Sequence, residues 1–421
     1  MKKRVGMYAW GGPSTIQLLK TKYHAPKIDE QSFMQLYEHA YWQKAQALFG
    51  VTDAWLTYSW GFSDEHEQAG YAFVLSKLLH FQKLGISTHA YVQGFNVVSA
   101  DFKNQDIFCR DPNGHLLPYS KGRLLTCPNN PSAVKIILDR VRAACCESFS
   151  GIFIDNLLFG LPPVLVSQDF VPFFGCACHF CQEKFKAQFS YDLPIEGLCE
   201  RTLPDYLQFR SSAVTNVISQ VANLTRKYHK ELGVNLYDPF LHTPELYFGY
   251  NLKELEPYLG YDLFENHAHP ARIVQGNVHL VDFLKKSKKP AFVVSYKDGI
   301  GFEKQFSQMD INQVFSESEQ LHYSPCLKAT EFTTQGVWHT LRLDKLSKPE
   351  RVDVSVEKFS ALKSNSLLPA KAWQVLFAKC IQKILPGAMS FIYEHAFLDL
   401  LLRKSGFYQK QLWSVKLHEL V

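Results

Sequence analysis

The sequence lacks a strong excess of charge of either sign. Its 45 lysine and arginine residues nearly balance its 40 aspartate and glutamate residues, which leaves a formal net charge of +5. The basic runs, such as Lys285 to Pro290, are short and have the composition of solvated loops. Because no stripe of lysine and arginine is present, the composition disfavours nucleic acid as a partner.

Long apolar runs are also missing. No stretch reaches the roughly 18 apolar residues of a membrane-spanning helix, which disfavours a membrane partner. The basic start, Met1 to Arg4, is not followed by the run of at least about seven apolar residues that a signal peptide requires. We therefore expect a cytoplasmic protein. In that setting the 10 cysteines indicate free thiols or a metal site rather than a disulfide framework.

Eight short apolar runs have the composition of buried parallel strands. Amphipathic segments with apolar residues three and four positions apart separate the first five of them. This alternation predicts an α/β fold, a closed (β/α)₈ TIM barrel. A doubly wound open sheet is the alternative, but the first strand is not followed by a glycine-rich phosphate loop. The predicted strands are 5–10, 54–60, 87–94, 151–156, 233–238, 261–270, 291–298 and 326–332, and the predicted helices are 32–50, 69–85, 131–149 and 206–233.

The alternation of strands and helices ends near Pro349. Helical spacing of apolar residues returns at 373–385 and 396–404. We therefore divide the chain into a barrel, residues 1–349, and a C-terminal helical extension, residues 350–421, packed on the barrel.

Polar and aromatic residues stand at the C-terminal ends of the predicted strands, where TIM barrels carry their active sites. Aromatic rings can stack on the apolar faces of a sugar while acids and amides bond its hydroxyl groups, so this mixture suits a polyhydroxylated ligand. The residues expected to bind such a substrate are Trp10, Trp60, Asn156, Tyr237, Asp238, His267, His269, Asp298 and Glu331.

The most specific motif is a Cys-x-Cys-x-x-Cys loop formed by Cys176, Cys178 and Cys181. Three thiols on one polar loop need a fourth ligand to close a tetrahedral zinc site. Cys127 and Cys109 precede the loop, and both are candidates for the fourth position. A zinc site in which the protein fills all four positions is structural, because no position stays open for substrate.

The same segment resembles the barrel β-galactosidases of glycoside hydrolase family forty-two. Those enzymes carry a Cys-Pro-Asn-x-Pro segment, which here begins at Cys127, and a Cys-x-Cys-x-x-Cys loop with a phenylalanine a few residues beyond it. The chain also resembles hypothetical glycosyl hydrolases through its RDPNG segment, Arg110 to Gly114. The resemblance covers about residues 108–227. It implies a carbohydrate ligand, a homo-oligomer and a structural zinc ion on Cys127, Cys176, Cys178 and Cys181.

The end of the fourth predicted strand departs from that family. In the β-galactosidases the strand ends Asp-Asn-Glu, and the glutamate is the acid/base. Here the matching residues are Asp155, Asn156 and Leu157, and leucine cannot donate a proton. The family's nucleophile is a glutamate at the end of strand seven, where this chain offers Asp298 at best. The family's own mechanism is therefore not expected here.

We predict instead a relocated catalytic pair, with Asp155 as nucleophile or base and Glu265 as acid. These residues end strands four and six, as the catalytic acids of some barrel α-glycosidases do. Asp298 and Glu331 are the alternates. Glycoside hydrolysis requires two carboxyl groups about 5–5.5 Å apart for retention of configuration and about 6.5–9.5 Å apart for inversion. A second interpretation of Asp155 is a structural carboxylate that orients Asn156.

Two further hypotheses stay open. The barrel binds carbohydrate without cleaving it, because Leu157 replaces the family's acid. Alternatively, His267 and His269 hold a hydrolytic zinc ion with Asp298, although alternate residues of a strand point to opposite faces.

Overall fold

The computed structural model describes most of the first 329 residues. The described residues are 4–9, 36–120, 122–160, 173–199, 201–237, 248–266, 283–295 and 308–329, together with Pro13, Ile16 and Met34. For Tyr237 and Glu265 the description covers the backbone. The predicted helical extension, residues 350–421, lies outside the described residues.

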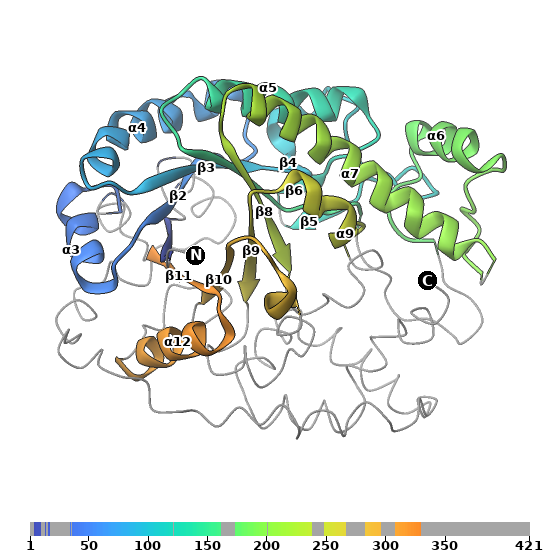
Figure 1. The fold of residues 1–421 in the computed structure, drawn as a ribbon. Coiled ribbons are helices and arrows are strands. Elements are labelled where there is room, and N and C mark those ends of the chain that lie inside the picture. The colour runs from blue at the N-terminus through green and yellow to red at the C-terminus, as the bar shows by residue number, and fades with distance from the viewer. Residues whose placement is uncertain are drawn as a thin grey trace, which may run out of the picture.

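Eight parallel strands close into a TIM barrel, as the alternation in the sequence predicts (Figure 1). The strands follow one another around the barrel in chain order, and the last pairs with the first through Cys326 opposite Gly6. They are β1 (Gly6–Ala9), β2 (Asp53–Ser59), β3 (Ser87–Gln93), β7 (Gly151–Asp155), β8 (Glu231–Tyr237), β9 (Tyr261–Asn266), β10 (Ala291–Ser295) and β11 (Ser324–Lys328).

The helices lie outside the ring of strands (Figure 1). Their ends follow local rules: α5 begins at Pro131 after the cap Asn130, and α3 is capped by Gly50, which follows it with a left-handed φ of 68°. Among the described residues no helix is long and apolar enough to cross a membrane. The helices are α3 (His39–Phe49), α4 (Asp64–Lys83), α5 (Pro131–Cys145), α6 (His179–Phe189), α7 (Leu203–Lys227), α9 (Leu252–Leu255) and α12 (Gln308–Leu321), with the 3-10 turns η2 (Ser99–Phe102) and η4 (Glu256–Tyr258).

The predicted helix boundaries are wrong by several residues. The segment predicted to be helical from Ser32 is a turn at residues 36 and 37, and α3 begins only at His39. The predicted helix 206–233 ends at Lys227, because β8 already begins at Glu231. Apolar spacing alone does not show where a helix gives way to the next strand.

Aromatic rings fill the middle of the barrel. Trp55 of β2 is fully buried, stacks on His89 of β3 at a centroid distance of 5.0 Å, and donates from Nε1 to the Tyr261 hydroxyl at 3.0 Å. Glycines in the facing strands make room for these rings: a Cβ atom at Gly233 would lie 2.0 Å from the ring of Tyr261. The interior is therefore a packed core rather than a pore, and ligands are confined to the barrel ends.

A charged network closes the N-terminal end of the barrel. Asp53 at the start of β2 accepts from Arg4 at 2.5 and 3.0 Å and lies 3.0 Å from Nε2 of His89. Arg4 also donates to both oxygens of Glu231 at 3.1 Å. Burial by itself raises the pKa of Asp53, but the hydrogen bonds from His89 and Arg4 outweigh it and hold this pKa well below its ordinary value.

A three-stranded antiparallel sheet between β3 and α5 is a feature that the sequence analysis did not predict. It consists of β4 (Asn96–Val98), β5 (Pro118–Ser120) and β6 (Arg123–Leu125), in the order β4, β6, β5. Val98 N–H donates to the carbonyl of Gly61 at 2.7 Å, which ties the sheet to the loop after β2. The small sheet thus lies against the C-terminal end of the barrel.

The charged network predicts a dependence of stability on residue 53 and on pH. Asp53→Asn removes the buried partner of Arg4 and His89, so we expect a loss of about 3 kcal/mol in unfolding free energy. Because the folded pKa of Asp53 is lowered, its contribution is fully present above about pH 4 and is lost progressively at lower pH. Guanidinium unfolding of both proteins as a function of pH measures this.

The control is Asp139→Asn on α5, which removes a half-exposed acid paired with Lys135 and Arg142. Such exposed pairs contribute about 0–1 kcal/mol. Equal effects of the two substitutions would show that the buried network is not specifically stabilising.

Candidate functional site

Strand β7 ends in a buried carboxylate at the C-terminal end of the barrel. Asp155 is 6% exposed and lies in register with Gln93 of β3. Its Oδ1 accepts from the backbone N–H of Asn156 at 2.7 Å and from the side-chain amide of Asn235. Its Oδ2 accepts from the Asn156 amide at 2.8 Å and from the Tyr91 hydroxyl. Four donated hydrogen bonds stabilise the ionised form of this group.

Tyr91 of β3 stays protonated beside this carboxylate. Burial raises the pKa of Tyr91 well above its ordinary value, and the negative charge of Asp155 adds to the effect. The Tyr91 hydroxyl also lies 3.0 Å from Oε1 of Gln93. A phenol has one proton, and the charged acceptor forms the stronger hydrogen bond, so the proton goes to Asp155.

Asn156, which follows Asp155, has a left-handed backbone with a φ of 56°. Asparagine adopts this region more readily than most residues. Its side-chain oxygen accepts from the Tyr119 hydroxyl of β5 at 2.6 Å, while its amide nitrogen donates to Asp155. The two contacts fix the orientation of the amide, so the geometry fits both a structural and a catalytic role for Asp155.

The residues around Asp155 are closely packed. A Cβ atom at Gly94 would lie 2.4 Å from the Asp155 carbonyl oxygen, which accepts from the Gly94 N–H at 2.8 Å. Leu157 is 0% exposed and belongs to the main apolar core. The carbonyl of Phe159 accepts from Arg210 of α7 at 2.6 and 3.2 Å. Position 157 therefore serves packing and carries no titratable group.

The structure brings Trp60 and Asn156 together around the Asp155 group. The Trp60 ring is 6% exposed, and its centroid lies 5.3 Å from that of Tyr91. The backbone of Glu265 lies near the end of β9, in register with Tyr237 and Val294. The other residues predicted to bind substrate lie outside the described residues, namely Trp10, Asp238, His267, His269, Asp298 and Glu331.

Three partners of Asp155 and Asn156 were missed by sequence reasoning. Tyr91 and Asn235 each stand two residues before the end of an observed strand, β3 and β8 respectively. The predicted strands run one residue further, to Gly94 and Asp238, so counting back in twos from their ends misses both residues. Tyr119 belongs to the small sheet, for which the sequence analysis found no strand pattern.

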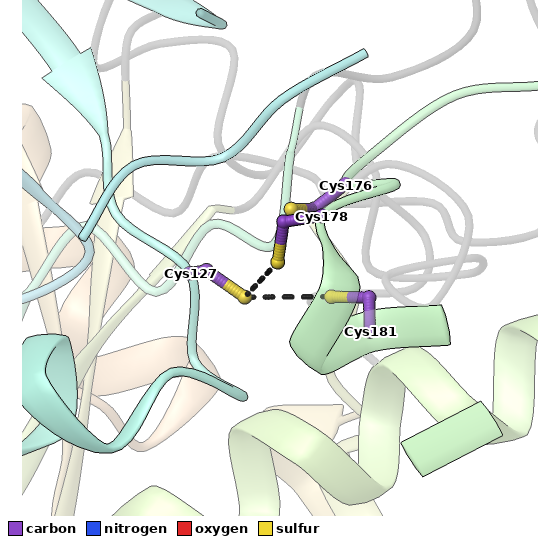
Figure 2. Close-up of side chains that lie close together, drawn as sticks. All are labelled: Cys127, Cys176, Cys178 and Cys181. Atoms are coloured by element: carbon purple, nitrogen blue, oxygen red, sulfur yellow. Dashed lines mark hydrogen bonds between the residues drawn. The ribbon is translucent and has the colours of Figure 1, made fainter. Parts of the chain in front are cut away.

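Four buried thiols form a second cluster (Figure 2). Cys127 precedes α5, Cys178 is the N-cap of α6, Cys181 lies in its first turn, and Cys176 is in the loop before it. The Cys127 sulfur lies 3.4 Å from that of Cys181 and 3.6 Å from that of Cys178, and all four sulfurs lie within 4.8 Å of one another. Sulfurs about 3.8 Å apart surround a tetrahedral metal with bonds of about 2.3 Å. The cluster can therefore hold a metal ion.

Nearby donors also suit thiolate ligands. The N–H groups of Arg110 and Asn129 lie 3.4 Å from the sulfurs of Cys176 and Cys127, respectively. Hydrogen bonds from Cys109 and the other thiols lower the pKa of Cys176, whereas burial raises the pKa of Cys181. Cys109, the other candidate for the fourth ligand, is not part of the four-thiol group, so Cys127 completes it. All nine cysteines in the described ranges are free.

No protein-family model matches the chain, and no curated protein matches it in sequence. Solved structures similar to it include the PgaB (BpsB) glycoside hydrolase domain from Bordetella bronchiseptica, with a TM-score of 0.54 and 11% identity over 83% of this chain and 99% of that one. The cold-adapted β-galactosidase from Rahnella sp. R3 has a TM-score of 0.54 and 12% identity over 78% and 50% of the two chains.

A third similar structure is the β-galactosidase from the haloarchaeon Halorubrum lacusprofundi, with a TM-score of 0.51 and 12% identity over 77% of this chain and 52% of that one. The chain thus spans about half the length of the two β-galactosidases. At these identities the similarity shows a shared TIM-barrel fold.

The Asp155 network predicts that the Tyr91 hydroxyl stabilises the fold. Tyr91→Phe leaves a buried carboxylate one donor short, so we expect a loss of about 1.5–3 kcal/mol in unfolding free energy. Guanidinium unfolding measures the difference. Tyr58→Phe is the matched control, because Tyr58 is 4% exposed and its hydroxyl makes no hydrogen bond within the described part of the chain. A Tyr91→Phe effect no larger than that of the control would contradict the network.

Proposed function

We propose that the chain is a glycoside hydrolase that acts on a carbohydrate at the C-terminal end of its barrel, distantly related to the barrel β-galactosidases. The observation that carries this proposal is the buried, fully hydrogen-bonded carboxylate of Asp155 at the end of the fourth barrel strand. Similarity to the barrels of several glycoside hydrolases supports it. The end of a barrel strand is also where TIM-barrel enzymes place catalytic groups.

Asp155 is proposed as the nucleophile or base. Two donors on each of its oxygens favour the carboxylate over the protonated acid. A group held in this form accepts a proton or attacks carbon, but it is poorly suited to protonate a leaving group. The general acid must therefore be a different residue.

Glu265 is proposed as that acid. Its backbone lies near the C-terminal end of β9, two strands beyond β7 in the barrel. Carboxyl groups on nearby strands of one rim can face each other across a glycosidic bond, and their separation sets the stereochemical outcome. Asp298 and Glu331 remain the alternates for this role.

A sugar-binding barrel without hydrolytic activity is the second candidate. Leu157 occupies the position of the acid/base in the enzymes that the sequence resembles, and it is fully buried in the core. A side chain in that position contributes no proton transfer. Binding would then use the rim residues, such as Trp60 and Asn156, without a second catalytic group.

Substitution of Asp155 and Glu265 distinguishes a glycoside hydrolase from a barrel that binds sugar without cleaving it. We expect wild type to hydrolyse at least one aryl glycoside in a panel of several sugars. Asp155→Asn and Glu265→Gln should each lower kcat/KM by at least about 10²-fold, since each removes a group that transfers charge or a proton. Chromogenic release of the aryl group measures the rates.

Asp139→Asn on α5 serves as the activity control, since it changes an exposed acid on an outer helix. Circular dichroism must show that the rim variants are folded, because Asp155→Asn also replaces an acceptor in a donor-rich site. Activity that survives both rim substitutions excludes the proposed pair. A wild type that binds sugars but hydrolyses none favours the binding barrel.

We further propose that the four-thiol cluster holds a structural zinc ion. The donor set of four cysteines suits zinc, and four filled positions leave none for substrate. An ion there would join the segment before α5 to the start of α6. Its role is to hold the loop after β7 in place, and no catalytic step requires it.

Metal analysis tests the zinc proposal. Purified wild type should carry about one zinc ion per chain. Cys178→Ser should weaken zinc retention against a chelator by at least about 100-fold, since even partners that only orient metal ligands contribute about 10–100-fold in affinity. Cys109→Ser is the matched control, because this buried thiol adjoins the cluster without belonging to it. A wild type free of zinc, or zinc lost from Cys109→Ser alone, would refute the assignment.

A further inference from the structure

A buried arginine without an ionic partner lies beside the candidate site. Arg123 of β6 is 2% exposed, and its guanidinium lies over the Trp60 ring at 5.6 Å. Its Nε donates to the Asn96 side-chain oxygen at 2.6 Å, and its Nη2 donates to the Asn96 carbonyl at 3.4 Å. Both contacts are to uncharged oxygens. Within the described residues no carboxylate forms an ion pair with Arg123.

Several polar atoms of this cluster lack partners. Nη1 of Arg123 and Nδ2 of Asn96 are buried without a hydrogen-bond partner in the described part of the chain. A buried donor left unpaired costs free energy, and a buried charge costs more, so the cluster is suited to receive an acceptor from outside the chain.

Glu67 of α4, an acid whose charge acts on Arg123, does not supply that acceptor. Glu67 is fully buried, and its oxygens accept from Ser59 at 2.6 Å, Tyr71 at 2.7 Å and the backbone N–H groups of Trp60 and Phe62. Its charge acts on Arg123 only at a distance. Burial lowers the pKa of Arg123, which is the expected response of a desolvated cation.

The cluster adjoins Asp155 through two aromatic rings. Trp60, which carries Arg123 on its ring, packs edge to face against Tyr91, and Tyr91 donates to Asp155. Gly61 leaves the necessary space: with its φ of 89°, a Cβ atom there would lie 2.6 Å from Nη2 of Arg123. Arg123 is therefore linked to the proposed catalytic carboxylate through Trp60 and Tyr91.

We propose that Arg123 and Asn96 bind the carboxylate of an acidic sugar, so that the substrate class is a uronic acid or a glycan that contains one. Two donors, Nη1 and Nδ2, match the two oxygens of one carboxylate. The hydrogen bond from Nε to the Asn96 side chain fixes the orientation of the guanidinium group. Because Arg123 is 2% exposed, the side chains that cover it must move when the ligand enters. The inference rests on the proposed function, which supplies the sugar.

The test compares sugars that differ only at C6, where a carboxylate replaces a hydroxymethyl group. Isothermal titration calorimetry on the full chain uses galacturonate and glucuronate as probes, with galactose and glucose as their neutral counterparts and galactose 6-sulfate as a second anion. We expect at least one sugar acid to bind about tenfold or more tightly than its neutral parent. Tighter binding of the sulfated sugar than of galacturonate would overturn the carboxylate assignment.

Two substitutions locate the effect. Arg123→Met keeps the volume of the side chain but removes its charge, and it should abolish the preference for the sugar acid. Asn96→Asp is nearly isosteric and gives Arg123 an internal carboxylate, so it should abolish the preference while the fold is retained. Arg140→Met is the matched control: Arg140 of α5 is 4% exposed and also has buried nitrogens, Nε and Nη1, that are unpaired among the described residues. It lies over Phe102 and donates to the Phe62 carbonyl rather than contacting Trp60 and Asn96, so its loss should leave the preference intact.

The outcomes separate this proposal from the proposed function. Equal binding of acidic and neutral sugars, no binding of any sugar acid, or a preference that survives in Asn96→Asp, each overturns the subsite. If the protein hydrolyses a neutral aryl glycoside but shows no preference for sugar acids, the hydrolase proposal is supported and the subsite proposal is refuted. If sugar acids bind in a way that depends on Arg123 but no aryl glycoside or aryl uronide is hydrolysed, the subsite proposal is supported and the hydrolase proposal is refuted.

Discussion

A carboxylate buried at the end of a strand must be hydrogen-bonded, and this requirement determines how the residues at the C-terminal end of the barrel are arranged. Asp155 draws one donor from β3, one from β8 and two from the residue that follows it. The same residue, Asn156, is held from the other side by Tyr119 of the small sheet. Three barrel strands and the added sheet therefore meet at one group, whose removal would leave several buried donors unsatisfied.

The barrel changes character along its axis. The N-terminal end is closed by the ion pairs of Arg4, and the middle is filled by aromatic rings around Trp55. The C-terminal end carries the polar network of Asp155 and the unpaired donors of Arg123 and Asn96. The paired charges therefore stabilise the N-terminal end of the barrel, while the unpaired donors leave the C-terminal end able to bind a polar ligand.

The segments that surround the rim are themselves anchored. The thiol cluster joins the start of α6, where the segment after β7 ends, to the segment before α5. Arg210 of α7 holds the carbonyl of Phe159, which fixes the chain just beyond Leu157. Such anchoring fits a site whose catalytic carboxylate must keep its position when a sugar binds.

The sequence by itself determined the barrel, its eight strands, the place of Asp155 at a strand end and the three-cysteine loop. Those features follow from local spacing of apolar residues and from a short motif, so neighbouring residues carry the information. Tertiary structure decided the rest. Tyr91 and Asn235 meet Asp155 across 64 and 80 residues. The family resemblance named Cys127 as the fourth thiol while motif spacing left Cys109 open, and the structure decides for Cys127, which lies 54 residues from Cys181 in the sequence. The small sheet that brings Tyr119 and Arg123 to the rim has strands of three residues, too short to show a period. Contacts between distant segments depend on register and closure of the barrel, which no local pattern of residues specifies.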